Sequence, residues 1–427
     1  MNQNRMKCGL LGEKLGHSYS PRIHGELADY EYLLYEKRPE EVESFVRHGD
    51  WHGLNVTIPY KKTVIPFCDS LTDMAREIGS VNTLLRREDG SILGDNTDAY
   101  GFRMLLDSVL KAAGDADKGT EEKRRSLPES GSDKALVLGT GGASVTVQAV
   151  LRSRGYQVVP ISRSGENNYE NIGRHSDAVL LVNTTPLGMY PKNGEKATDL
   201  RLFPRLRAVL DVVYNPARTA LMLQAEELGI PAAGGLKMLV AQAWRAAEIF
   251  LGRDIPETEM LRIERQLSTE MRNLILIGMP GSGKSTVASL LGERLGRVCV
   301  EADEELEKQA GMSIPEIFRL EGEEGFRRRE TEILRELGKS SGIILSTGGG
   351  CVVRPENYPL LHQNGIIVRI ARDTAKLARA GRPLSLNADL EAMYRTRDPL
   401  YERFADFTVS NDGRAEDTAE RILEVIS

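Results

Sequence analysis

Residues 278–285 have the composition and spacing of a loop that binds nucleotide phosphates. They read Gly-Met-Pro-Gly-Ser-Gly-Lys-Ser and fill the pattern G-x-x-x-x-G-K-[ST] at every fixed position. In such a loop the glycines turn backbone N–H groups inward, Lys284 reaches the terminal phosphates, and the Ser285 hydroxyl suits Mg²⁺. An apolar run at 274–277 predicts the strand before the loop, and the pattern after it predicts a helix. The residues expected to bind the nucleotide are Gly278, Gly281, Gly283, Lys284, Ser285 and Thr286.

The first hundred residues place polar side chains at the ends of several short apolar runs. Ser18 and Ser20 crowd the start of a predicted helix, where hydroxyls beside exposed N–H groups suit a carboxylate. A simple helix cap is the alternative for Ser20. Lys61 follows a predicted strand, although a lone lysine in a loop is usually only a solvated charge. Polar groups placed repeatedly at strand ends suggest one shared crevice, and the others are Asn82, Thr83, Asn96 and Asp98.

A second phosphate-binding turn is predicted after an apolar strand at 134–138. Two of its glycines are adjacent and its third small residue is not glycine, so it departs from the pattern G-x-G-x-x-G. The next strand ends at Arg163, near the position that contacts the adenosine ribose. An acidic residue there would favour NAD, whereas an arginine can pair with a 2′-phosphate, so we expect NADP. A surface arginine at a strand end is the alternative. The residues expected to bind this cofactor are Gly139, Gly141, Gly142, Ala143, Ser162 and Arg163.

The last third of the chain carries acids, glycines and arginines at further strand ends. A strand starting at Arg297 delivers Glu301 and Asp303. An apolar strand at 343–346 ends in three glycines, where the backbone must approach a ligand closely or turn sharply. Arg327 begins a run of three arginines, and such a run is most often a solvated helix face. The remaining candidates are Gly348, Gly349, Gly350, Arg382 and Arg397.

Length and charge indicate a multidomain protein that does not attract polyanions generally. The 427 residues, 41% of them hydrophobic, predict about three folding units of roughly 150 residues. Because a P-loop opens its domain, a complete unit is expected before it. The 56 basic and 62 acidic side chains give a net charge of -6, which provides no basic field for nucleic acid or an anionic membrane. No stretch approaches the ~20 apolar residues of a membrane span, and we expect a cytoplasmic protein. The cysteines, expected to be reduced, are Cys8, Cys68, Cys299 and Cys351.

Four motifs of the first half resemble, in order, those of the shikimate dehydrogenase family. They are His17-Ser-x-Ser20-Pro, Asn55-Val-Thr-Ile-Pro-x-Lys61, Val81-Asn82-Thr83 and Asn96-Thr-Asp98. The resemblance implies that Lys61 and Asp98 form the catalytic pair. Such a pair suits the reduction of a ketone, because it orients the proton donor and stabilises developing negative charge. The resemblance further implies substrate-carboxylate contacts at Ser18, Ser20 and Tyr214, and ring-hydroxyl contacts at Thr57, Asn82 and Gln242.

Residues 272–427 resemble the shikimate kinase family along their whole length. The motifs are the P-loop, the acidic pair, Phe326-Arg327, the triple glycine, Arg382-Pro383-Leu384 and Arg397-x-Pro-Leu-Tyr401. The resemblance implies that Asp303 holds substrate hydroxyls and assists proton removal, while Arg327 and Arg397 clamp the carboxylate. It also implies that Gly348, Gly349 and Gly350 contact the ring, and that Arg382 is a lid arginine approaching ATP. Phosphoryl transfer depends mostly on alignment and charge neutralisation, which Lys284, Mg²⁺ and Arg382 would supply.

Two departures from the kinase pattern concern the metal and the lid. Glu301 stands where the family usually has aspartate, and the longer side chain is expected to alter the Mg²⁺ water shell beside Ser285 and Ser346. The residues expected at the metal are Ser285, Glu301 and Asp303. The segment from Arg379 to Arg382 is several residues short for a kinase lid, which implies weaker closure or a different lid geometry.

The predicted fold is α/β throughout, with a two-domain dehydrogenase followed by a P-loop kinase domain. The dehydrogenase pairs a small substrate domain with a Rossmann-like NADP domain, and 112–134 are expected to form an exposed loop. The expected boundaries are 1–268 for the dehydrogenase (1–100 plus about 236–255 for substrate, about 101–235 for NADP), about 256–271 for a helical connector, and 272–427 for the kinase.

Together the resemblances imply a bifunctional enzyme with consecutive reactions. The first half would reduce 3-dehydroshikimate with NADPH, and the second would phosphorylate shikimate with MgATP to shikimate 3-phosphate. Two alternatives for the first half are an NAD-dependent quinate/shikimate dehydrogenase, which Arg163 disfavours, and a non-catalytic shikimate-binding regulatory module, which needs no cofactor loop. The expected partners are small molecules, without nucleic acid or membrane, and an oligomer is compatible with the sequence. Channelling of shikimate between the sites is a hypothesis motivated by the covalent linkage.

Overall fold

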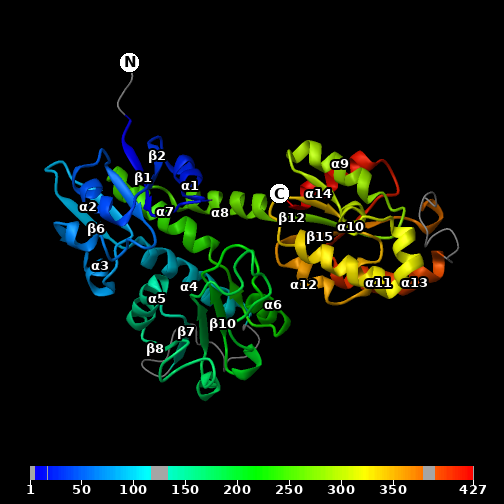
Figure 1. The fold of residues 1–427 in the computed structure, drawn as a ribbon, viewed down its shortest axis with the longest axis horizontal. Helices are drawn as coiled ribbons and strands as arrows, with labels where there is room; N and C mark the ends of the chain where they lie inside the picture. Colours follow the sequence, from blue (N-terminus) through cyan, green and yellow to red (C-terminus); the bar gives the residue numbers. More distant parts are fainter. Residues whose placement is uncertain (1–4, 17, 117–132, 378–389, 427) are drawn as a thin grey trace. The chain divides into compact units, whose positions relative to one another are not determined.

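The computed structural model describes residues 5–16, 18–116, 133–377 and 390–426, which form two compact units (Figure 1). The first unit comprises Met1–Met189, Gly194–Tyr214 and Leu221–Gln266, and the second comprises Tyr190–Asn193, Asn215–Ala220 and Leu267–Ser427. Within the described ranges, no helix combines the length and the hydropathy needed to span a membrane. Both units alternate helices with strands, which confirms the predicted α/β fold class. Among the predicted site residues, Arg382 lies outside the described ranges, as does His17 of the first motif.

The first unit begins with a six-stranded sheet in the order β2-β1-β3-β5-β6-β4. Asn55 on β3 pairs with Thr83 on β5, which also pairs with Asp95 on β6. This register brings the end of β3, the start of β5 and the end of β6 to the same edge of the sheet. The strands are β1 (Lys7–Gly12), β2 (Glu31–Glu36), β3 (Gly53–Val56), β4 (Ser70–Leu71), β5 (Thr83–Arg86) and β6 (Ile92–Asp95), and the helices between them are α1 (Ser20–Leu27), α2 (Pro39–His48) and α3 (Asp73–Ile78).

Two long helices complete this part of the molecule. Helix α4 (Thr97–Ala116) packs along α7 (Leu236–Leu251), and α7 also contacts α1. Helix α7 also contacts β5, and the Phe250 carbonyl lies 2.9 Å from the ring nitrogen of His52. The loop predicted at 112–134 is wrong at its start, because α4 continues to Ala116. Alanines favour the helix there, and 117–132 lie outside the described residues.

His24 on α1 is fully buried, with its Nδ1 atom 2.6 Å from the Tyr30 hydroxyl. Burial lowers the His24 pKa from 6.5 to about 3. Below about pH 6.5 this histidine is protonated in the unfolded chain but stays neutral in the folded chain. The folded state therefore loses stability as the pH falls toward 3. We expect protonation of this histidine to lower the free energy of unfolding by up to about 1.4 kcal/mol per pH unit across that range.

The measurement is denaturant unfolding of the wild type and of His24→Gln between pH 7 and pH 4, followed by tryptophan fluorescence. Both tryptophans, Trp51 and Trp244, lie in the first unit, so the signal reports that unit. The variant should lose stability less steeply than the wild type as the pH falls. Parallel pH profiles would contradict the assignment.

The first unit also contains a five-stranded parallel sheet in the order β11-β10-β9-β7-β8. Its central strands are apolar and buried, because side chains from both faces enter hydrophobic cores, as is usual for parallel sheets. Helices α4, α5 and α7 contribute to one core and α6 to the other. The elements are β7 (Lys134–Leu138), α5 (Gly142–Ser153), β8 (Gln157–Ile161), β9 (Leu180–Asn183), β10 (Ala208–Asp211), α6 (Ala220–Glu227) and β11 (Ala232–Ala233).

The second unit is built on a five-stranded parallel sheet in the order β13-β14-β12-β15-β16. Helices α9 and α14 pack on one face and α10 to α13 on the other. Ligand sites in such sheets form at the carboxyl ends of the strands. The strands are β12 (Asn273–Ile277), β13 (Cys299–Glu301), β14 (Ile344–Ser346), β15 (Gly365–Ala371) and β16 (Phe407–Ser410), and the helices are α9 (Lys284–Leu295), α10 (Ala302–Ala310), α11 (Ile314–Leu337), α12 (Asn357–His362), α13 (Leu390–Phe404) and α14 (Ala415–Ile426).

The helix predicted at 256–271 is present as α8 (Glu257–Met271). Its apolar positions Met260, Ile263 and Leu267 are almost fully buried. The helix therefore has a packed face, as the spacing of its apolar residues indicates.

Candidate functional site

In the first unit, Lys61 and Asp98 form an ion pair with a distance of 2.6 Å between Nζ and Oδ2. Lys61 lies in the turn after β3, and Asp98 lies in the first turn of α4, directly after β6. Both side chains are mostly buried, at 20% and 13% exposed. The positive end of α4 attracts the negative charge of a carboxylate at this position. An ammonium group held in this way can deliver a proton in a fixed direction.

Asn82 lies at the same helix start and is almost fully buried. Its Oδ1 atom accepts a hydrogen bond from the backbone N–H of Thr97, at 2.7 Å. Asp98 directly follows Thr97 in the chain. Asn82 and the Lys61–Asp98 ion pair therefore lie at the same edge of the sheet. The polar side chains Lys61, Asn82 and Asp98 therefore lie together at this edge of the sheet, and a shared crevice there stays a prediction.

The predicted contacts Ser18, Ser20, Tyr214 and Gln242 lie on other parts of the first unit. Ser20 opens α1, and its backbone N–H donates to the Ser18 hydroxyl at 3.2 Å. Between these serines, Tyr19 meets the Tyr214 ring edge to face at 6.1 Å, and burial raises the pKa of the Tyr214 phenol. Gln242 on α7 packs against α4, where its Cβ lies 3.2 Å from the position of a Cβ at residue 101, and its Nε2 donates to a carbonyl of its own helix.

Thr57 occupies the position just beyond β3, on the way to Lys61. Its backbone N–H donates to the Leu11 carbonyl at 2.9 Å. Its methyl group would contact a side chain at residue 12, which is glycine. Thr57 is thus fixed beside the end of β1, at the same edge as Lys61.

The glycine turn after β7 leads directly into α5. Gly139 has a φ of 101°, which favours glycine, and Gly141 is the N-cap of α5. A Cβ at Gly141 or Gly142 would meet no atom within 4 Å, so the space in front of the helix start is open. Ala143 lies in the first turn of α5. A helix start with free space before it fits the pyrophosphate of a dinucleotide.

Ser162 and Arg163 follow β8, the neighbour of β7. Arg163 is exposed, and the Ser162 hydroxyl donates to the Ser164 carbonyl at 2.5 Å. Both residues therefore lie at the carboxyl end of the strand beside the glycine turn, as the sequence predicts. An exposed guanidinium at this position is free to meet an anionic group on the cofactor.

In the second unit, Lys284 opens α9 and is only 7% exposed. Its ammonium group donates to the carbonyls of Gly278 and Met279, at 3.0 and 3.2 Å. Gly278, Gly281 and Gly283 have φ angles of 149°, 85° and 94°, in the region that favours glycine. Ser285 and Thr286 are exposed in the first helical turn. This geometry fits a triphosphate.

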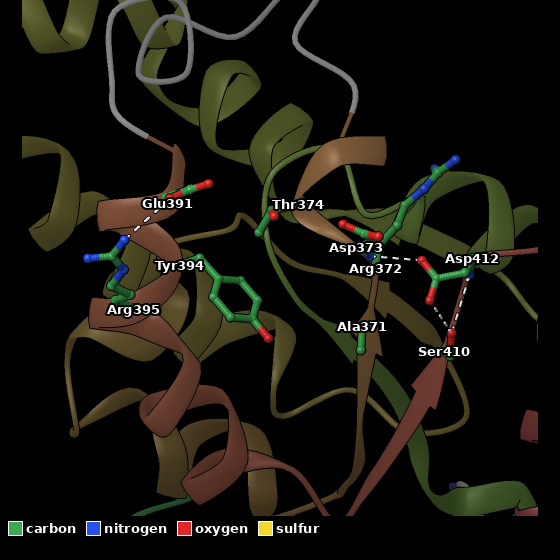
Figure 2. A pocket seen from close by; sticks show the side chains of 9 residues that line it. All are labelled: Ala371, Arg372, Asp373, Thr374, Glu391, Tyr394, Arg395, Ser410 and Asp412. Carbon is green, nitrogen blue, oxygen red and sulfur yellow. Dashed lines mark hydrogen bonds and ion pairs between the residues drawn. The ribbon is translucent and has the colours of Figure 1, made fainter.

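A cavity of about 440 Å³ lies at the ends of β15 and β16 (Figure 2). Asn411 lies between two residues that line the cavity, Ser410 and Asp412, and its side chain donates to the Ser282 carbonyl of the P-loop at 2.7 Å. Tyr394 and Arg395 come from α13, whereas Arg372 and Asp412 come from the strand ends (Figure 2). The lining residues are Ala371, Arg372, Asp373, Thr374, Glu391, Tyr394, Arg395, Ser410 and Asp412.

Glu301 ends β13 and pairs in register with Ser346 on β14. Burial raises the pKa of the Glu301 carboxyl, and the hydroxyls of Ser346 and Ser285 oppose that shift. Glu301 thus lies within reach of Ser285, as expected for a shared metal. The described ranges hold no group of three acidic, histidine or cysteine side chains around one point. Mg²⁺ commonly takes only one or two protein ligands, together with phosphates and water.

Arg327 is the centre of a second charged cluster in this unit. It is only 4% exposed and forms an ion pair with Glu330 at 2.7 Å. The next two arginines differ from it, since Arg328 is exposed and Arg329 pairs with Glu321 at 2.7 Å. Because Arg327 is buried, the triple arginine run is not one solvated face.

Glu330 is a functional candidate that the sequence reasoning missed. Burial raises the pKa of its carboxyl, and the charge of Arg327 opposes that shift. The signal available in the sequence was that Glu330 follows Arg327 by three positions, because residues three apart on a helix are neighbours on one face.

The triple-glycine loop after β14 gathers the other predicted residues of this cluster. The Gly349 carbonyl accepts from Arg397 at 3.0 Å and from the hydroxyl of Tyr401. The Asp303 carboxylate lies 2.7 Å from the position of a Cβ at Gly348, and a Cβ at Gly350 would overlap the Arg327 guanidinium. Arg327, Arg397 and Asp303 therefore all lie against the triple-glycine loop, whose residues have no side chains.

Comparisons with known proteins agree with this division of sites. The family model "Shikimate dehydrogenase substrate binding domain" matches residues 10–84, and the model "Shikimate kinase" matches residues 280–427. A shikimate dehydrogenase of Oleidesulfovibrio alaskensis is 37% identical over 278 residues, which are 59% of this chain and 92% of that protein. One of Brucella abortus is 36% identical over 283 residues, which are 60% of this chain and 92% of that protein.

Solved structures give the same result for the first part of the chain. A chorismate mutase/shikimate 5-dehydrogenase fusion protein from Clostridium acetobutylicum has a TM-score of 0.54 at 32% identity, covering 62% of this chain and 98% of that one. Shikimate 5-dehydrogenase from Thermus thermophilus, in complex with NADP(H) and shikimate, has a TM-score of 0.50 at 28% identity, covering 61% and 99%. Both halves of the chain thus match enzyme families, which disfavours a non-catalytic first half. The chain belongs to the shikimate dehydrogenase family and continues into a shikimate kinase domain, as a fusion of the two enzymes.

Proposed function

We propose that residues 1–268 reduce 3-dehydroshikimate to shikimate with NADPH, and that 272–427 phosphorylate shikimate with MgATP to shikimate 3-phosphate. The observation that carries the proposal is the Lys61–Asp98 ion pair, at 2.6 Å, in a chain that also holds the Arg327 cluster beside a P-loop. The first site suits ketone reduction and the second suits phosphoryl transfer to a carboxylated alcohol.

In the first reaction, Lys61 gives a proton to the ketone oxygen while Asp98 holds the ammonium in line. The glycine turn before α5 would hold NADPH, whose chemistry would be hydride donation to the ketone carbon. The developing alkoxide is stabilised by the adjacent ammonium. The substrate contacts that we propose are Ser18, Ser20 and Tyr214 for the carboxylate, and Thr57, Asn82 and Gln242 for the ring oxygens.

In the second reaction, Asp303 accepts the proton of the attacking ring hydroxyl. That oxygen forms a bond to the γ-phosphorus as the bond to ADP breaks, and Lys284 stabilises the charge on the phosphate oxygens. Arg327 and Arg397 hold the carboxylate against Gly348, Gly349 and Gly350. Ser285, Glu301 and Asp303 would hold Mg²⁺, which would neutralise charge on the phosphate oxygens, and the nucleoside of ATP would occupy the cavity of Figure 2. Arg382, outside the described residues, is proposed as the lid arginine.

The choice between NADP and NAD is tested by oxidation of shikimate, followed at the nicotinamide absorbance band. The wild type should reduce NADP with a higher kcat/KM than NAD, and Arg163→Gln should lose most of this preference because the 2′-phosphate loses its cationic partner. A clear preference of the wild type for NAD would support the quinate/shikimate dehydrogenase alternative. Absence of any absorbance change with either cofactor would overturn the dehydrogenase proposal.

Gly350→Ala should weaken shikimate binding in the kinase, because the new methyl group would displace the Arg327 guanidinium. We expect the KM for shikimate to rise about tenfold or more, as for a weakened charge-assisted hydrogen bond. The KM for ATP serves as an internal control and should stay within about twofold. Steady-state kinetics with each substrate varied in turn measures both values, and an unchanged KM for shikimate would contradict the placement of Arg327.

A further inference from the structure

A chain of buried hydrogen bonds lies behind the proposed substrate contact Asn82. The Tyr32 hydroxyl donates to Oδ1 of Asn55 at 2.7 Å, and Nδ2 of Asn55 donates to the Thr83 hydroxyl at 3.4 Å. The Thr83 hydroxyl lies 3.1 Å from Oδ1 of Asn82 and 3.0 Å from the Thr97 hydroxyl. Thr83 is thus the meeting point of three other polar side chains, and it has no exposed surface.

The chemistry of these groups fixes which end of the Asn82 carboxamide faces them. A backbone N–H can only donate, so the atom 2.7 Å from the Thr97 nitrogen must be the amide oxygen. The Thr83 hydroxyl receives the Asn55 N–H, which leaves its own proton for Asn82 or Thr97. The amide oxygen of Asn82 accepts from the Thr97 backbone N–H and also lies within hydrogen-bond distance of the Thr83 and Thr97 hydroxyls, at 3.1 and 3.3 Å. Within the described ranges, its Nδ2 makes no hydrogen bond, so the donor end is the one left for a ligand.

We propose that Thr83 is a positioning residue that holds the Asn82 carboxamide with its N–H groups toward the substrate. The inference rests on the proposed dehydrogenase function. Asn82 then binds a ring oxygen as a donor only, and a turned amide would present its oxygen to that atom instead. Because Thr97 directly precedes Asp98, the same hydroxyl also fixes the start of the helix that carries the catalytic carboxylate.

Tyr32 extends this network toward the other end of the substrate. Its side chain is half-buried, and its ring stacks on His24, with centroids 4.0 Å apart. Its hydroxyl interacts with Ser20, a proposed carboxylate contact, as well as with Asn55. The polar chain therefore connects the two sets of residues proposed to hold opposite ends of the ring, and Thr83 is its junction.

The test compares Thr83→Val, Thr83→Ser and the wild type in the reduction of 3-dehydroshikimate. Valine keeps the shape but removes the hydroxyl, so kcat/KM should fall about tenfold or more, whereas serine should stay within about threefold of the wild type. The control is Thr146→Val, which makes the same change at a buried threonine of α5. Tryptophan fluorescence in denaturant checks that each variant folds.

Substrate analogues separate positioning from general damage to the fold. On the analogue of 3-dehydroshikimate that lacks the ring hydroxyl contacted by Asn82, either 4-deoxy or 5-deoxy, Thr83→Val should equal the wild type. An equal penalty on both analogues and on the full substrate, or no penalty at all, would overturn the positioning role. A wild type that is inactive with 3-dehydroshikimate would overturn the proposed function, and this role with it.

Discussion

Replacing Lys61 by alanine is expected to slow turnover in the dehydrogenase reaction by about 10²- to 10⁴-fold, the usual effect of removing a general acid. The side chain is the ammonium paired with Asp98 at 2.6 Å, so the variant loses the proton donor and leaves a mostly buried carboxylate without its cation. The kinase reaction of the same protein should be unchanged. Assays of both activities on one preparation measure the effect.

Lys62→Ala is the matched control for this prediction, because Lys62 is the next residue and is exposed. It removes the same charge from the same turn without touching Asp98. We expect both activities of this variant to stay within about twofold of the wild type, as for a surface charge. Equal losses in Lys61→Ala and Lys62→Ala would mean that the turn matters only through its net charge.

Replacing Lys284 by alanine should have the opposite pattern. Its buried ammonium donates to two P-loop carbonyls and is a fixed cation of the loop that is predicted to bind the phosphates. Its removal should slow turnover in the kinase reaction by about 10²- to 10³-fold, as for other preorganised electrostatic groups. The reduction of 3-dehydroshikimate should not change.

Lys308→Ala provides the control here, because that lysine is on α10 of the same unit and is 76% exposed. It should leave both reactions near the wild-type rates. A Lys284→Ala protein that loses both activities would contradict the independence of the two sites, whereas one that retains kinase activity would contradict the role of the P-loop.

The sequence was most informative where one site is built from neighbouring residues. The P-loop predicts strand β12 and helix α9 because its glycines, lysine and serine lie within eight positions. The Lys61–Asp98 pair could be proposed only through the family resemblance, since 37 residues separate its members. What joins them is the pairing of β3, β5 and β6, and no local pattern specifies that order.

Other features depend on packing and were missed or misjudged. Arg327 belongs to a run that is typical of a solvated face, yet one of its three arginines is buried against Glu330. Thr83 was predicted only as one of several polar groups at strand ends and as part of a motif, without a positioning role, because its hydroxyl partners come from β3 and α4. Helix α4 continues into the segment predicted as a loop, to Ala116, because alanines favour the helix there. For Arg327 and Thr83, the deciding contacts are made by side chains that no linear motif brings together.

The most direct test of the whole account is a single coupled reaction of the intact protein with 3-dehydroshikimate, NADPH, ATP and Mg²⁺. The account predicts that one NADPH is oxidised and one ADP is formed for each molecule of shikimate 3-phosphate. Omitting ATP should leave NADPH oxidation intact, and omitting NADPH should stop both reactions. The account would be contradicted if ADP formed from 3-dehydroshikimate without NADPH. It would also be contradicted if the protein formed ADP from shikimate but did not oxidise NADPH with 3-dehydroshikimate.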